Sequence, residues 1–141
     1  MPKLDPFAGP GFAAMSALSK AIDDDADLPL GLIELIKLRC SQINGCTYCV
    51  RMHTEKALQA GETAERVDNV GQWQQHAAFT ERERRVFALA ESVTHVADTH
   101  VDEDVLDAAI AELGAPVTQQ VVWLVAVVNA FNRLAITARI D

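Results

Sequence analysis

Two cysteines and a histidine stand at a spacing that could carry redox chemistry, because Cys46, Cys49 and His53 occupy positions i, i+3 and i+7. On a helix this spacing places all three side chains on one stripe. The two thiols are then within plausible disulfide reach, and a histidine four residues after the second thiol can take or return a proton. The spacing therefore indicates a redox dithiol with a proton carrier beside it.

The residues immediately before Cys46 predict how one of the thiols could be activated. Asn44 and Gly45 are typical of the end of one helix, so Cys46 falls at or near the start of the next. At a helix start, unpaired main-chain N–H groups and the helix dipole favour a thiolate over a thiol, whose free pKa is about 8.5.

A carboxylate, Glu34, lies at a comparable depth in the preceding helix. A short link at Gly45 makes the two helices antiparallel neighbours, with Glu34 roughly 16 Å back along one and His53 roughly 12 Å along the other. The two side chains could meet if Glu34 faces its neighbour, and Glu34 could then orient or recharge His53. The same face also carries Lys37 and Ser41, so a surface pair between Glu34 and Lys37 is the alternative.

A structural zinc site is the main alternative to a dithiol, because both use Cys-x-x-Cys. Tetrahedral zinc usually needs a second pair of ligands, and Cys40 with His53 could supply it only if Cys40 turned toward Cys46. Cys40 lies in an apolar helical pattern, where a free cysteine is usually a small buried hydrophobe. We therefore predict no metal and no cofactor, and ordinary core or surface roles for the other three histidines, His76, His95 and His100.

The composition of the 141-residue chain excludes several classes of partner. The formal net charge of −8 leaves no basic patch for nucleic acid. Residues 1–7 lack the basic-then-apolar order of a signal peptide, and the longest apolar run, residues 121–128, is too short to span a bilayer. We expect a soluble cytoplasmic protein. The acidic run at residues 23–27 is predicted to be a solvated helix end rather than a cation site.

The elements that must position these side chains are all predicted to be helical. We find no alternating strand pattern, and residues 1–141 have the size of a single compact domain of about six to seven helices, with residues 1–11 as an irregular lead-in. A capping box at residues 80–83 opens one helix, whose apolar stripe extends to Ala97. Residues 72–79 are ambiguous. The predicted helices span residues 12–25, 30–43, 46–60, 62–70, 80–97, 102–113 and 117–138.

These residues also resemble a known family. Glu34, followed twelve positions later by the first cysteine of Cys46-x-x-Cys49-x-x-x-His53, is similar to the signature of the AhpD-like alkylhydroperoxidases in the carboxymuconolactone decarboxylase family. The resemblance covers most of the chain, with further similar blocks at Trp73 and at residues 79–83, 91–94 and 129–133.

The resemblance implies an all-helical AhpD-like fold that assembles into homo-oligomers, commonly trimers or hexamers. It also implies a peroxidase in which a cysteine reduces a hydroperoxide, a Cys46–Cys49 disulfide forms, and an external dithiol or thiol protein re-reduces it. In this scheme Glu34 and His53 match the family's proton relay.

Two parts of this scheme stay open at the level of sequence. The helix start favours Cys46 for exchange with the reductant, whereas the nearby His53 favours Cys49 for proton transfer, so the peroxide could meet either thiol. The positions between the cysteines hold Thr47 and Tyr48, where lipoyl-linked members often carry a histidine, so the reductant is also open. A non-catalytic redox-sensing oligomeric module and a lactone decarboxylase-like enzyme, which needs no dithiol, are the alternative functions.

Overall fold

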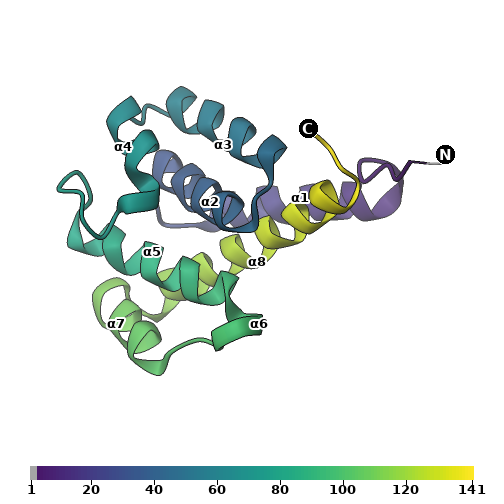
Figure 1. Cartoon of the computed structure of the whole chain (residues 1–141). Helices are drawn as coiled ribbons and strands as arrows, with labels where there is room; N and C mark the ends of the chain where they lie inside the picture. Colours follow the sequence, from purple (N-terminus) through teal and green to yellow (C-terminus); the bar gives the residue numbers. More distant parts are fainter. Residues whose placement is uncertain (1–2) are drawn as a thin grey trace.

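The computed structural model describes residues 3–141 and is all-α, as predicted (Figure 1). Within those residues no strand occurs, and eight α-helices replace the expected six to seven. They are α1 (Gly9–Asp25), α2 (Leu30–Asn44), α3 (Thr47–Gln59), α4 (Ala64–Asn69), α5 (Glu81–Thr94), α6 (Val96–Thr99), α7 (Glu103–Leu113) and α8 (Ala115–Thr137), with a 3-10 turn, η1, at Val70–Gln72.

Helix α2 is the centre of the fold, with α3, α5 and α8 packed around it (Figure 1). Its sequence is rich in Leu and Ile on every side, and a helix that is apolar all round is stable only when buried. Accordingly all of residues 31–38 are buried, including the two charged ones, Glu34 and Lys37. The central helix therefore brings a carboxylate and an ammonium into the interior.

The turn between α2 and α3 has the predicted geometry. Gly45 adopts a left-handed conformation with φ of 71°, which glycine reaches without the steric cost that a Cβ imposes. The chain thereby reverses within two residues, and α3 returns along α2. This reversal sets Cys46 at the start of α3.

Two predicted boundaries were wrong. Helix α1 begins at Gly9, inside the expected irregular lead-in, because Pro10 is tolerated in the first turn, where its missing N–H needs no partner. Helix α5 ends at Thr94 rather than running to Ala97, which lies exposed in the separate short helix α6. No side chain of α6 is buried, so the apolar face of α5 has no core to pack against beyond Thr94.

Helices α1 and α8 run along each other at one side of the molecule (Figure 1). No residue of α1 is buried, whereas α8 alternates buried and exposed positions along its length. Among the described residues, α8 is the one helix long and apolar enough to cross a membrane, which the shorter apolar run at 121–128 did not predict. Core helices of soluble proteins pass the same test, so this is weak evidence for a span.

Candidate active site

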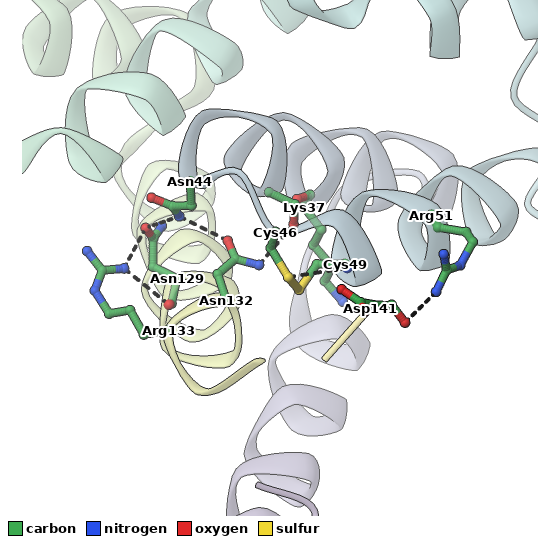
Figure 2. Close-up of a disulfide and its surroundings, with 10 residues drawn as sticks. Lys37, Asn44, Cys46, Cys49, Arg51, Asn129, Asn132, Arg133 and Asp141 are labelled. Carbon is green, nitrogen blue, oxygen red and sulfur yellow. Dashed lines mark hydrogen bonds between the residues drawn. A yellow bond between two sulfur atoms is a disulfide. The ribbon is translucent and has the colours of Figure 1, made fainter. Parts of the chain in front are cut away.

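Cys46 and Cys49 form a disulfide at the start of α3 (Figure 2). Their Cα atoms are 5.2 Å apart, so the spacing predicted from the sequence does bring the sulfurs together. Cys46 is the N-cap residue of α3, and its Sγ accepts a hydrogen bond from the Cys49 main-chain N–H at 3.3 Å. The first sulfur thus lies against unpaired N–H groups, where negative charge is stabilised.

The buried stripe of α3 carries the second sulfur and the histidine together. Cys49, His53 and Ala57 are the buried residues of this helix, as the i, i+4 and i+8 spacing predicts. The opposite face, with Arg51, is exposed.

Glu34 and His53 meet across the α2–α3 contact. His53 Nδ1 lies 2.8 Å from Glu34 Oε2, and the two residues are only 6% and 5% exposed. Burial alone would raise the pKa of Glu34, but the hydrogen bond from His53 and the charges of Lys37, His53 and Lys56 outweigh it and hold that pKa below its ordinary value. An ionised carboxylate only accepts, so Nδ1 donates and Nε2 is left to exchange a proton.

Lys37 extends this pair into a chain of charges. The sequence suggested the Glu34–Lys37 pair as a surface contact, but its burial and the further link to Asp23 were missed. Lys37 Nζ lies 3.8 Å from Glu34 Oε1 and 2.6 Å from Asp23 Oδ2 of α1. The expectation of a solvated acidic run is therefore wrong for Asp23, although Asp24 does point outward and pairs with exposed Lys20. The available signal was a lysine three residues after Glu34 in the part of α2 that is otherwise apolar, residues 30–38.

A cavity of about 460 Å³ opens beside Cys49 and His53. Its walls come from the N-terminal segment, α1, α2, α3 and α8, and much of the lining is apolar or aromatic. The rings of Phe7 and Phe12 pack edge to face at 5.3 Å, and Phe12 meets Phe131 at 6.2 Å. Periodicity within one helix does not predict such a cavity, since four helices from both ends and the middle of the chain line it.

The two sulfurs have different surroundings. Cys49 lines the cavity, whereas Cys46 does not, and both residues are almost fully buried. Ile140 packs against the cluster of Cys46, Cys49 and Ala135, and its main-chain N–H donates to the Ala135 carbonyl at 3.0 Å. Figure 2 shows Arg51 reaching the end of this C-terminal segment (residues 139–141), where Nη2 donates to the Asp141 main-chain oxygen at 2.7 Å.

An amide network fastens the end of α2 to α8 next to Cys46 (Figure 2). Asn44 Nδ2 donates to Asn129 Oδ1 at 2.8 Å and to Asn132 Oδ1 at 2.9 Å. Asn132 Nδ2 in turn donates to Ser41 Oγ at 3.0 Å. Buried amides satisfied in this way fix one arrangement of the helices, so the network holds the turn before Cys46 in place.

The zinc alternative finds no support in residues 3–141, where no cluster of three or more possible ligands occurs. Cys40 is fully buried, accepts a hydrogen bond from Thr94 Oγ1 at 3.4 Å, and faces α5 instead of Cys46. Its place in the apolar core confirms the prediction of a small buried hydrophobe. Burial raises the pKa of its thiol to about 11. None of the other three histidines lines the cavity beside Cys49.

The structure defines a class of all-helical proteins in which a cysteine pair lies beside a buried Glu–His pair. The chain belongs to the carboxymuconolactone decarboxylase family, whose sequence model matches residues 10–92. That range contains Glu34, both cysteines of the pair and His53.

Individual proteins are similar to most of this chain. The uncharacterized protein YdfG of Bacillus subtilis is 29% identical over 103 residues, which are 73% of this chain and 70% of YdfG. The crystal structure of ATU0492 from Agrobacterium tumefaciens, a protein of unknown function suggested to be the antioxidant defence protein AhpD, superposes with a TM-score of 0.92 at 26% identity, covering 100% of this chain and 97% of that one. The fold is therefore AhpD-like.

A debrominase has the same fold at greater sequence distance. Apo Bmp8 superposes with a TM-score of 0.82 over 91% of this chain and 68% of its own, at 21% identity. A cysteine-to-alanine variant of Bmp8 in complex with 2,3,4-tribromopyrrole matches equally well, at 20% identity. At this level of identity the likeness concerns the fold.

Proposed function

We propose that the chain is a thiol-dependent peroxidase that reduces organic hydroperoxides through Cys46 and Cys49, with Glu34 and His53 as its proton relay. The observation that carries the proposal is the disulfide-forming pair at the wall of a largely apolar cavity, next to a histidine whose Nδ1 is held by a buried carboxylate. Family membership and the likeness to ATU0492 support the same class of chemistry.

The first step consumes the peroxide. A thiolate attacks the terminal oxygen of ROOH, the O–O bond breaks, and the sulfur becomes a sulfenic acid. The alkoxide takes a proton and leaves as the alcohol ROH. His53 Nε2 is suited to move the thiol proton to this alkoxide, because Glu34 holds Nδ1 and stabilises the protonated ring.

The second step forms the disulfide and the third restores the thiols. The other cysteine attacks the sulfenic sulfur, the S–S bond forms, and the hydroxyl group leaves as water. An external dithiol or thiol protein then supplies two electrons and two protons through a mixed disulfide and is itself oxidised. The sum is ROOH plus a dithiol giving ROH, water and a disulfide.

We assign the peroxide to Cys49 and the reductant to Cys46. Cys49 lines the cavity together with His53, so a hydroperoxide bound there meets a thiol that has a proton carrier one helical turn away. Cys46 lies outside the cavity lining, at a helix N-terminus that favours its thiolate. When the reductant attacks Cys46, Cys49 leaves as a thiolate, and Cys46 is then a good leaving group when the second thiol of the reductant resolves the mixed disulfide.

The proposal includes the assembly and its setting. Residues 1–141 form one domain that associates as a homo-oligomer, trimer or hexamer, in the cytoplasm. The exposed apolar side chains of Leu18 on α1 and Trp123 on α8 support an association surface.

Hydroperoxide consumption with dithiothreitol as the reductant tests the function. We expect Cys46→Ser and Cys49→Ser to lose turnover, while Cys40→Ala, which removes the thiol outside the pair, keeps it within about threefold. Single-turnover oxidation also tests the assignment, because Cys46→Ser should still accumulate a sulfenic acid at Cys49. Unchanged turnover in both serine variants would rule the peroxidase out.

The same experiment separates the two alternatives. A redox-sensing module would consume about one equivalent of peroxide and change its oligomer distribution without further turnover. Activity on a lactone substrate that survives loss of both Cys46 and Cys49 would favour the decarboxylase-like enzyme.

A further inference from the structure

Lys37 is a charged side chain in the core of α2, beside the Glu34–His53 pair. Its side chain is 10% exposed, and its ammonium lies 2.6 Å from Asp23 Oδ2 and 3.8 Å from Glu34 Oε1. Burying an ammonium is costly unless carboxylates compensate the lost hydration. One ammonium here serves two carboxylates, so its charge is shared between them.

The two oxygens of Glu34 have separate partners. Oε2 accepts from His53 Nδ1, while Oε1 faces Lys37 Nζ. Lys37 is three residues after Glu34 on the same helix, which keeps its ammonium within reach of that carboxylate whatever α1 does. The charge on Lys37 therefore acts on the carboxylate that orients His53.

Asp23 draws on the same ammonium from another helix. Its Oδ1 is buried and has no hydrogen-bond donor among residues 3–141, so Lys37 is the protein group in that range that holds this carboxylate. Asp23 competes with Glu34 for the Lys37 ammonium, and it does so from α1, which also forms a wall of the cavity.

We propose that Lys37 is a positioning residue that keeps Glu34 ionised and its carboxylate fixed toward His53, and that Asp23 moderates this effect by sharing the Lys37 ammonium. The inference rests on the proposed peroxidase function in one respect only, which is that the oriented His53 carries a proton for peroxide reduction. The charge coupling itself concerns Asp23, Lys37 and Glu34 and can be measured without turnover.

Charged groups other than Lys37 and Asp23 also lie around Glu34. From α3 come His53 and Lys56, and from α1 comes the exposed Lys20–Asp24 pair at the cavity wall. The part of α8 that lines the cavity is uncharged, with Val128, Phe131, Leu134 and Ala135. Burial would raise the pKa of Glu34, and after the hydrogen bond from His53 the charge of Lys37 is the strongest influence that lowers it.

The direct test is a carbon-13 NMR titration of the Glu34 carboxyl, assigned with Glu34→Gln, in wild type, Lys37→Met, Lys37→Arg and Asp23→Asn. Lys37→Met should raise the pKa of Glu34, and Lys37→Arg should restore it toward wild type. Asp23→Asn should lower it, because the whole ammonium charge then acts on Glu34. The opposite signs are the decisive feature, since a merely structural role would move both variants the same way or neither.

A kinetic test measures the effect of the same charge on the reactivity of Cys49. The rate at which iodoacetamide alkylates Cys49 of the reduced protein is measured against pH, with the modified peptide quantified by mass spectrometry. On the acid side Lys37→Met should react at least about threefold more slowly than wild type, and Lys37→Arg should recover the rate. Arg85→Met removes an exposed cation from α5, outside the cavity lining, and should leave the profile unchanged.

Several results would overturn the positioning role: a Glu34 titration that Lys37→Met leaves unchanged, a shift of equal sign in Asp23→Asn, or an Arg85→Met profile that moves as much as that of Lys37→Met. Should Lys37→Met fail to fold, Asp23→Asn decides, because an unchanged or raised pKa of Glu34 in that variant contradicts the sharing. Opposite shifts in a protein without peroxidase turnover would keep the coupling and reject the proposed function.

Discussion

Two buried thiols on neighbouring helices, Cys40 and Cys49, show that burial alone does not define a reactive site. Cys40 contacts the Thr94 hydroxyl, has no opening to a cavity, and has a thiol pKa raised to about 11 by burial. Cys49 is almost as buried, yet it lines a cavity, shares it with His53 and is bonded to Cys46. The difference is access to a cavity and a histidine that shares that cavity with the thiol.

Thiol labelling should give the largest contrast between the two regions. In the reduced native protein at pH 7.5, we expect alkylation of Cys40 to be at least about a thousandfold slower than that of Cys49, because Cys40 is closed off and holds its proton. Peptide mass spectrometry after timed iodoacetamide exposure measures both rates, and labelling in urea provides the unfolded reference. Comparable alkylation rates for Cys40 and Cys49 in the native protein would contradict the difference in access.

The second largest contrast is expected when the neighbour of each thiol is substituted, His53 for Cys49 and Thr94 for Cys40. His53→Gln should lower the rate of hydroperoxide reduction about a hundredfold, since it removes the proton carrier beside Cys49. Thr94→Val, which removes the hydroxyl bonded to Cys40, should change that rate by less than about twofold. Stopped-flow oxidation of the reduced proteins measures both, and an equal loss in the two variants would point to a general loosening of the fold.

Glu34 should contribute to the pH dependence of the free energy of unfolding. A carboxyl whose folded pKa lies below its unfolded value of 4.5 adds stability above pH 4.5, and this stability is lost as the pH falls through the folded value. Glu34→Gln should cost about 1 kcal/mol at pH 7 and lose less stability than wild type on acidification below pH 4.5. Urea unfolding at a series of pH values tests this, with parallel acid curves as the contradicting result.

The C-terminal segment (residues 139–141) should give the smallest effect. Arg51→Ala removes one exposed hydrogen bond to Asp141, so reduction of the disulfide by dithiothreitol should accelerate only about two- to fivefold. Arg133→Ala is the matched control, because that arginine is also exposed but bonds to Asn129 within α8. Equal acceleration in the two variants would show that the segment does not limit access.

The site could be predicted from the sequence as far as it depends on spacing within helices and on one turn. The positions of Cys46, Cys49 and His53 follow from periodicity, and their depth relative to Glu34 follows from the reversal at Gly45. The roles of these residues stay predictions.

What sequence reasoning missed depends on contacts between distant segments. Asp23 looked solvated because the acidic run around it is polar, yet α1 packs so that this one carboxylate turns inward to Lys37. The cavity needs Phe12 of α1 and Phe131 of α8 to lie together, which no local pattern encodes. The end of α5 at Thr94 likewise depends on where the core stops, since its stripe continues in sequence to Ala97.

The end of the described chain lies beside the disulfide, with Asp141 bonded to Arg51 and Ile140 packed on the cysteines. A dithiol module fused after Asp141 through a short flexible linker would therefore meet the Cys46–Cys49 bond at an effective concentration in the millimolar range. Exchange would become intramolecular, and its rate would no longer depend on how much reductant is dissolved. The same proximity makes this end a poor place for a purification tag, because any appended residues would begin next to the bond whose reduction is being measured.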